Sequence, residues 1–187
     1  MKTSTDEFES LHIDTVPQEY IEGVIHEIND LGCSFGSENW RESHPDSPHL
    51  DTESIYLRMP EEISVNSVFN ELLATTTVWG RCSPITMRVV MDAMHLLNLV
   101  ELGRVMLVKL KPGGKITPHP DEGAYCAYYN RYHIPIVTND DVLFTVGEKT
   151  VNMGAGELWE INNKKVHSVV NNGDTDRIHL IFDARPL

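Results

Sequence analysis

Hydrophobic positions follow a helical spacing at three places in the first half of the chain. Over residues 17–30, apolar side chains recur every three or four positions, at Ile21, Val24, Ile25 and Ile28, which places them on one face of a helix. Gly32 follows as the expected stop. A broad apolar face also predicts a helix over Met87–Leu99, and a shorter helix is expected over Ser67–Thr77. Residues 36–60 are polar, contain three prolines and predict a long loop.

From Arg104 onward the pattern changes to an alternation of apolar and polar residues, which is the period of a β-strand. Eight short strands are predicted, separated by turns rich in Gly, Asn, Asp and Pro: RVMLVKL, KITPH, RYHIPIV, VLFTV, KTVNM, ELWEI, VHSVV and RIHLIF. Such regular spacing is typical of a sandwich or barrel of the jelly-roll kind. We therefore expect a mainly β fold with the helices against one outer face.

The length of 187 residues fits a single domain that can bury a full core. Within it, the patterns predict a helical and loop support region over residues 1–103 and a β-barrel core over residues 104–187. No repeat or low-complexity segment interrupts this organisation.

The chain is acidic, with 28 Asp and Glu against 15 Lys and Arg and a formal net charge of −13. Because nucleic-acid affinity rests largely on neutralising phosphates, this charge argues against a duplex-binding surface and favours a neutral or cationic substrate. No apolar run is long enough for a membrane helix, and the first ten residues do not form a secretory signal. Three widely spaced cysteines form neither a disulfide framework nor a zinc motif, so a cytoplasmic location is expected.

Candidate metal chemistry centres on His119-Pro120-Asp121. Residues two apart on an extended segment point to the same face, so an imidazole and a carboxylate can take adjacent positions around one metal ion. His167, on another predicted strand, would complete a facial triad of two histidines and one carboxylate, which is typical of non-haem iron(II) oxygenases. Two further His-x-Asp sequences, at residues 44–46 and 49–51, are better explained as surface loop.

Arg177 follows ten residues after His167, inside the strand RIHLIF. A guanidinium that faces a core needs an anionic partner, and its fork suits the distal end of a dicarboxylate. The alternative is a buried salt bridge, for example with Asp121 or Asp183.

The later part of the sequence resembles a known family. The run ELWEINNKKVHSVVNNGDTDRIHLIFD resembles the end of the aspartyl/asparaginyl β-hydroxylases, which are 2-oxoglutarate oxygenases. The matching positions are Trp159, His167, Asn171, Arg177 and Leu180 to Asp183, together with the element Arg131-Tyr132-His133-Ile134-Pro135. The resemblance covers roughly residues 104 to 185.

The resemblance implies a double-stranded β-helix in which His119, Asp121 and His167 bind Fe(II). Arg177 would pair with the C5 carboxylate of 2-oxoglutarate, the cosubstrate. Arg131 and His133 would face the pocket and touch the C1 carboxylate or the primary substrate. With O2, such an enzyme would release succinate and CO2 and hydroxylate a C–H bond, for example of an Asp, Asn or other amino-acid side chain in a peptide, a protein or a free amino acid.

Other interpretations stay open from the sequence. The chain could be a non-catalytic cupin that binds a metal or small ligand, although such a protein has no need of Arg177, or an oxygenase acting on a nucleobase. His133 on its own could be structural, His179 could support Arg177 or be structural, and Trp159 is expected in the core. The loop over residues 40–58 could be solvated or could contact substrate through polar groups, namely His44, His49, Asp51, Thr52 and Arg58.

Overall fold

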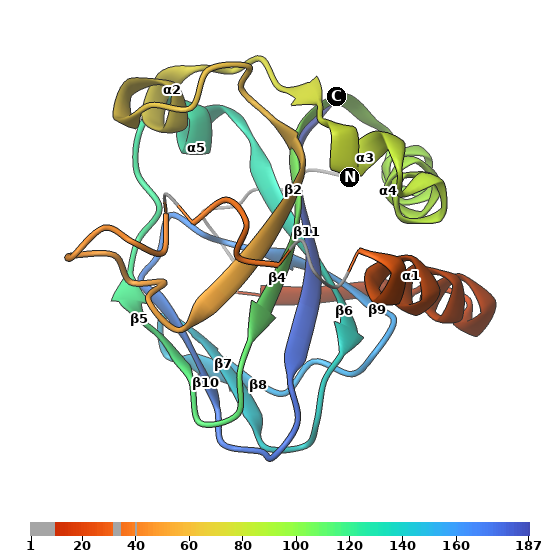
Figure 1. The fold of residues 1–187 in the computed structure, drawn as a ribbon, viewed down its shortest axis with the longest axis vertical. Coiled ribbons are helices and arrows are strands. Elements are labelled where there is room, and N and C mark those ends of the chain that lie inside the picture. The colour runs from red at the N-terminus through yellow and green to blue at the C-terminus, as the bar shows by residue number, and fades with distance from the viewer. Residues whose placement is uncertain (1–9, 32–34, 40) are drawn as a thin grey trace.

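Two antiparallel β-sheets face each other in the computed structural model, which describes residues 10–31, 35–39 and 41–187 (Figure 1). The large sheet has the strand order β1 (Ser10–Thr15), β9 (Glu157–Ile161), β6 (Asn130–Val137), β11 (Arg177–Pro186), β4 (Leu99–Leu110), β2 (Thr52–Met59) and β3 (Thr75–Thr76). The small sheet has the order β5 (Lys115–His119), β10 (His167–Asn171), β7 (Val142–Val146) and β8 (Lys149–Val151). The predicted mainly β architecture is confirmed.

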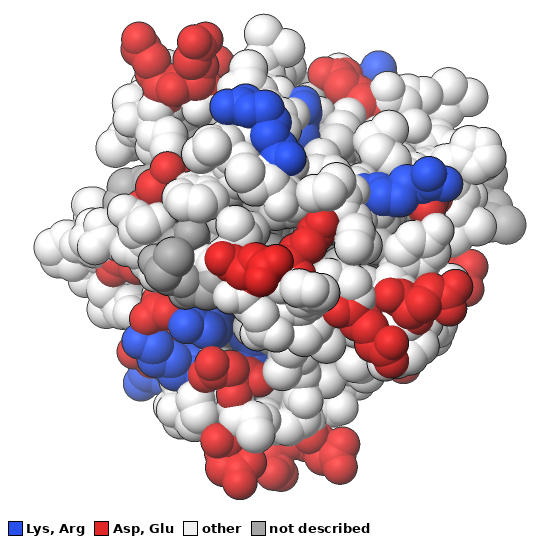
Figure 2. Space-filling view, turned by 45° about the vertical axis from the view of Figure 1, so that its right-hand side comes forward, with Lys and Arg blue, Asp and Glu red and all other residues white. Residues whose placement is uncertain are grey.

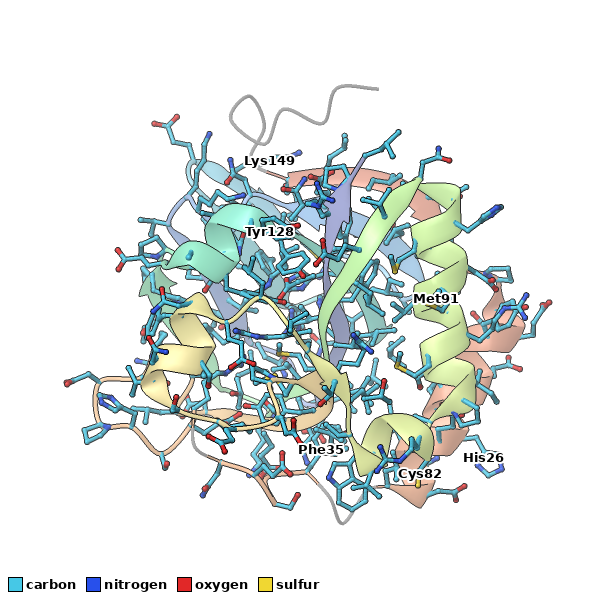
Figure 3. The ribbon with its side chains drawn as sticks, turned by 90° about the horizontal axis from the view of Figure 1, so that it is seen from above. His26, Phe35, Cys82, Met91, Tyr128 and Lys149 are labelled. Carbon is cyan, nitrogen blue, oxygen red and sulfur yellow. The ribbon has the colours of Figure 1, made fainter. Side chains whose placement is uncertain are left out.

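Strand β11 shows how the alternating pattern builds the two layers. Ile178, Leu180 and Phe182 belong to the larger hydrophobic core, which the outer face of the large sheet shares with helices α1 (Gln18–Asp30) and α4 (Pro84–Leu96). Seen from above, the two helices lie next to each other on one side of the sheets, with Met91 on α4 (Figure 3). Arg177, His179 and Ile181 alternate with the core residues and point to the opposite, inner face of the sheet.

The inner faces of the two sheets enclose a second apolar cluster, which includes Leu110, Phe144, Val146, Ile161 and Val169. Trp159 belongs to it, as expected. This cluster holds the large and small sheets together, so the side chains of β10 and β5 are positioned opposite those of β6 and β11. Polar side chains that point inward from the two sheets meet in the space between them.

All eight predicted strands are present, and β4 begins five residues earlier than expected, at Leu99. One expectation was wrong: the long loop over residues 36–60 contains strand β2. Both faces of β2 are largely buried, because Ile55 and Leu57 belong to the larger hydrophobic core while Tyr56 and Met59 belong to another apolar cluster. Such a strand lacks the alternation that reveals a half-exposed one. Strand β1 also comes from the first half of the chain.

The helices follow the sequence patterns with shifted ends. Helix α4 starts at Pro84, three residues before the predicted start, and ends at Leu96, shortly before Asn98, which has a positive φ of 52°. The helix expected over Ser67–Thr77 is shorter, because α2 covers Val65–Asn70; two further short helices are α3 (Val78–Arg81) and α5 (Ala124–Tyr128). Helix α1 ends at Asp30, and the expected stop at Gly32 lies outside the described residues.

The surface carries scattered groups of acidic side chains with fewer basic ones between them, as one face shows (Figure 2). Within the part of the chain that the structure describes, no helix has the length and apolar character of a membrane span.

Candidate metal centre and cosubstrate pocket

His119, Asp121 and His167 converge at one end of the small sheet, as their spacing predicted. His119 closes β5 and lies opposite His167, the first residue of β10, in the strand pairing. One potential ligand atom from each of the three side chains lies within 4.8 Å of the other two. The two imidazole rings are 4.4 Å apart between centroids. Two imidazoles and one carboxylate are therefore placed to hold a single ion.

Both histidine rings are held by their Nδ1 atoms. Nδ1 of His119 lies 2.7 Å from the carbonyl oxygen of Thr117, and Nδ1 of His167 lies 3.0 Å from that of Lys165. These contacts place the proton on Nδ1 and leave the Nε2 lone pair free for a metal. Nε2 of His119 is buried without a hydrogen-bond partner among the described residues. Burial, and after it the neighbouring His167, lowers the pKa of His119, so the ring is neutral and able to coordinate.

Asp121 contributes one carboxylate oxygen to the same cluster of potential ligand atoms. Its Oδ2 accepts hydrogen bonds from Arg131 and, at 2.9 Å, from Nδ2 of Asn163, while its backbone N–H donates to the Asn163 carbonyl. Oδ1 lies 3.7 Å from Nε2 of His119. Burial acts to raise the pKa of Asp121, but Arg131 and the histidines outweigh it and hold the pKa well below its usual value. The donor set of two neutral imidazoles and one carboxylate oxygen fits Fe(II).

Arg131 lines the cavity, but its guanidinium already has partners. It bridges Asp121 and Asp183, donating to the Asp183 carboxylate from Nε at 2.7 Å and from Nη2 at 2.9 Å. Asp183 also accepts a hydrogen bond from the Tyr125 hydroxyl at 3.1 Å. These bonds fix the orientation of Asp121. The expected contact of Arg131 with the C1 carboxylate or the substrate stays a prediction.

Arg177 is fully buried and has no ion pair among the described residues. Its Nη2 donates to Nδ1 of His179 at 2.7 Å, while Nε and Nη1 are buried without partners. Burial, and then Arg41, lowers the pKa of Arg177 to about 9. The alternative of a salt bridge with Asp121 or Asp183 is excluded here, because both carboxylates pair with Arg131.

His179, on the same strand β11 as Arg177, and His133, on the neighbouring strand β6, support this guanidinium. Their Nδ1 atoms lie 3.3 Å apart, and because Nδ1 of His179 accepts from Arg177, His133 must be the donor of the pair. The His133 ring also lies edge-on to Phe144 at 5.3 Å. Burial, followed by Arg177, lowers the pKa of both histidines well below 6.5, which keeps His179 neutral and able to accept.

Arg177 and one member of the triad, His167, line the same narrow cavity between the sheets. Its wall is formed by six apolar and six polar side chains: Val108, Ile116, Phe144, Ile161, Val169, Ile181, Arg41, His49, Arg131, His133, His167 and Arg177. Two of these polar groups, Arg41 and His49, come from the segment that precedes β2. From the sequence, His49 was only one of several candidates for a substrate contact, and Arg41 was not predicted. Neither residue belongs to a periodic element.

The other candidates of that segment have structural contacts. Arg58 donates to backbone carbonyls of Gly103 and Ala74, and Asp51 accepts from the backbone of Lys115. Thr52 bonds to Glu42 and to the His49 carbonyl, and His44 is exposed. Only His49 of the five reaches the cavity.

Comparison with known proteins agrees with this geometry. The model of the family described as aspartyl/asparaginyl beta-hydroxylase matches residues 68–186. A curated relative, L-proline cis-4-hydroxylase of Rhizobium meliloti (strain 1021), is 30% identical over 77 residues, which are 41% of this chain and 28% of that protein. The match thus spans little more than a quarter of the relative's length.

Solved structures with similar folds have low sequence identity. A prolyl hydroxylase from Trichoplax adhaerens, in complex with a peptide fragment of the hypoxia inducible factor, superposes with a TM-score of 0.65 at 10% identity and covers 96% of this chain and 84% of its own. HygX from Streptomyces hygroscopicus, with nickel and 2-oxoglutarate bound, gives 0.59 at 12% identity and covers 97% and 84%. These likenesses concern the fold alone.

The two facing sheets and the His-Asp-His cluster define the class: a double-stranded β-helix of the kind found in the 2-oxoglutarate and Fe(II) oxygenases. Within that class, the chain belongs to the aspartyl/asparaginyl β-hydroxylase family, whose model matches more than half of it.

Proposed function

We propose that this protein is an Fe(II)- and 2-oxoglutarate-dependent dioxygenase that hydroxylates a C–H bond of an amino-acid substrate, either free or within a peptide or protein. The observation that carries the proposal is Arg177, a fully buried guanidinium with no anionic partner among the described residues, in the same cavity as the triad. An unpaired buried charge is costly unless a ligand completes it. A cupin that only binds a metal has no use for this arginine.

Each residue of the cavity has a distinct part in this proposal. His119, His167 and Oδ1 of Asp121 would hold Fe(II), and Arg131 keeps the other oxygen of Asp121 turned away from the ion. Arg177 would bind the C5 carboxylate of 2-oxoglutarate by a charge-assisted pair. The apolar wall limits water around the reacting groups. When bound, iron would activate O2, which is the oxidant: one oxygen atom would convert 2-oxoglutarate to succinate and CO2, and the other would enter the C–H bond of the substrate.

An amino-acid substrate is favoured by the family and by the curated relative. The family is described by hydroxylation of Asp and Asn, and the relative by hydroxylation of proline. Both descriptions name the hydroxylation of a carbon atom of an amino acid. The net charge of −13 argues against a nucleic-acid substrate.

The test is succinate formation from 2-oxoglutarate with Fe(II), O2 and a panel of free amino acids and short peptides. His119→Ala and His167→Ala should abolish turnover and weaken binding of a metal such as Co(II), which is followed by its absorption spectrum. Asp121→Ala should also cause a large loss. Full activity in either histidine variant would remove the assignment of the metal centre.

Arg177 separates an oxygenase from a metal-binding cupin. Deleting one partner of a desolvated charge pair costs about 2–5 kcal/mol, so Arg177→Ala should raise the KM for 2-oxoglutarate by about thirtyfold or more. Arg177→Lys should recover only part of the affinity for 2-oxoglutarate, because an ammonium group cannot reproduce the forked geometry of a guanidinium. Metal affinity should stay near that of the wild type. An unchanged dependence on 2-oxoglutarate in the alanine variant would contradict the proposal.

A further inference from the structure

Arg41 is a second guanidinium in the cavity without an anionic partner. It lies in the polar segment before β2, is half-buried and lines the same cavity as His167 and Arg177. Its Nη1 contacts the sulfur of Met106 at 3.6 Å, and its Nε is buried without a hydrogen-bond partner. Thioether sulfur is a weak acceptor, so this contact leaves the charge uncompensated. The described residues offer Arg41 no carboxylate within ion-pair distance.

The proposed function uses the other two arginines of the cavity but leaves Arg41 unassigned. Arg131 is neutralised by Asp121 and Asp183. Arg177 is assigned to the C5 carboxylate of 2-oxoglutarate, and the C1 carboxylate of the cosubstrate would lie on the metal. Once the cosubstrate is bound, the charge of Arg41 is still unmatched. A further anion is therefore needed to complete the cavity.

Arg41 and His49 lie on the side of the metal ligands. The His49 ring is edge-on to the His119 ring, with centroids 4.8 Å apart. Nδ1 of His49 is buried without a hydrogen-bond partner and is available to a ligand. Arg41 lines the same cavity as His167 and Arg177, which places its charge near both the triad and the cosubstrate end.

We propose that Arg41, with His49 beside it, binds a carboxylate of the primary substrate, and that this substrate is therefore an amino acid bearing a carboxylate close to the carbon that is hydroxylated. The inference rests on the proposed function and specifies its substrate. A guanidinium fork binds a carboxylate through two parallel hydrogen bonds, which also orients the bound molecule. The carboxylate is either the α-carboxylate of a free amino acid or the side chain of an acidic residue, and the two sources share this chemistry.

The experiment compares acids with their amides. Substrate-dependent succinate formation is measured with the twenty free amino acids, with their α-amides, and with aspartate and glutamate capped as N-acetyl amides. The expected result is turnover of at least one acid and a loss of about thirtyfold or more in kcat/KM when its recognised carboxylate becomes a carboxamide. Loss with the α-amide identifies a free amino acid, whereas turnover of a capped acidic residue identifies the side chain.

Arg41→Gln should cause the same loss in kcat/KM for the acid, and this loss should exceed any change in the KM for 2-oxoglutarate by about tenfold or more. The matched control is Arg88→Gln, an exposed arginine on α4 paired with Asp92, which should change neither quantity. Binding gives a second readout: with Zn(II) and 2-oxoglutarate present, the substrate acid should raise the melting temperature of the wild type but not of Arg41→Gln.

Three outcomes would overturn the proposal. In the first, Arg41→Gln raises the KM for 2-oxoglutarate as much as it lowers kcat/KM for the acid, which would assign the arginine to the cosubstrate. In the second, acids and amides react equally well. In the third, no acid of the panel is turned over or raises the melting temperature, although succinate forms without substrate. Complete absence of succinate formation together with absence of metal binding would instead refute the proposed function itself.

Discussion

Arg131 is the residue on which the geometry of the metal centre depends most. It sits between Asp121 and Asp183, and burial works against its charge, but the two carboxylates outweigh burial and raise its pKa well above the usual value. We predict that Arg131→Gln lowers the free energy of unfolding of the metal-free protein by about 3–5 kcal/mol, because two buried carboxylates lose their cation. Urea unfolding measures this change.

Metal should restore part of that stability, since a divalent ion at Asp121 replaces some of the missing charge. The matched control is Arg88→Gln, which removes an exposed pair and should leave the urea midpoint of unfolding nearly unchanged. Equal stability of Arg131→Gln and the wild type would show that the bridge is not important.

Glu160 gives the protein a pH dependence that is separate from the site. Burial, opposed by Asn130, raises the pKa of this carboxyl group to about 7 in the folded protein. An unfolded glutamate titrates near 4.3, so between about pH 4.3 and 7 the folded state binds more protons and stability falls as pH rises. We predict that Glu160→Gln unfolds at higher urea concentration than the wild type at pH 8 and that this advantage shrinks toward pH 4.5.

The gain at pH 8 should be at most about 4 kcal/mol, because the pKa of Glu160 rises from about 4.3 in the unfolded chain to about 7 in the folded protein and each pKa unit corresponds to about 1.4 kcal/mol. An advantage that is the same at both pH values would show that packing and not titration distinguishes the two side chains.

At this scale, sequence reasoning could predict the convergence of the triad and Arg177, because His119, His167 and Arg177 lie on strands whose alternation fixes their faces and Asp121 follows two residues after His119. It could not predict the partners of Arg131. Asp183 is 52 residues away, and the pairing of Asp183 with Arg131 depends on the register between β6 and β11. Arg41 was missed for a related reason: the segment that carries it has no period from which a direction follows.

A buried carboxylate connects helices α1 and α4. Glu27 on α1 accepts hydrogen bonds from the backbone N–H groups of Ile85 at 2.7 Å and Thr86 at 2.8 Å, in the first turn of α4, and from the Thr86 hydroxyl at 2.6 Å. These N–H groups have no partner within their own helix, and a negative charge at a helix N-terminus is stabilising. Glu27 therefore caps α4 from a neighbouring helix.

We predict that Glu27→Gln lowers the free energy of unfolding by about 1–3 kcal/mol, the range for hydrogen bonds to a charged group. The KM for 2-oxoglutarate should not change, because the helices lie on the outer face of the large sheet. Glu22→Gln on the exposed face of α1 is the control and should stay within about 0.5 kcal/mol of the wild type. Equal effects of the two variants would rule out the cap.

The elements that sequence reasoning identified best are the half-buried strands of the second half, whose alternation is regular. Strand β2 was missed because it is buried on both faces and follows a polar segment with prolines, so neither of its flanks nor its own pattern indicated a strand. The interhelical cap was equally hidden, since nothing in the sequence around Glu27 indicates which helix its carboxylate reaches.

The whole molecule carries a net charge of −13 while its cavity holds unmatched positive charge at Arg41 and Arg177. Mutual repulsion among acidic groups destabilises a compact state, and salt screens it. We predict that raising NaCl from about 0.02 M to 0.3 M, where the screening length falls below about 10 Å, increases the urea midpoint of unfolding. KCl should also increase the urea midpoint. A decrease in the midpoint with both salts would mean that specific ion pairs outweigh the repulsion.

The position of β11 has a consequence for how the protein is made. This strand is the last one in the sequence, yet it lies in the interior of the large sheet between β6 and β4, and it supplies Arg177, His179 and Asp183 to the site. A chain leaves the ribosome from its N-terminus, so β6 and β4 emerge before the strand that separates them. Until β11 inserts, Arg131 lacks Asp183 and the cavity lacks Arg177. The cosubstrate should therefore bind only after β11 has inserted, whereas the three proposed metal ligands all precede this strand in the chain.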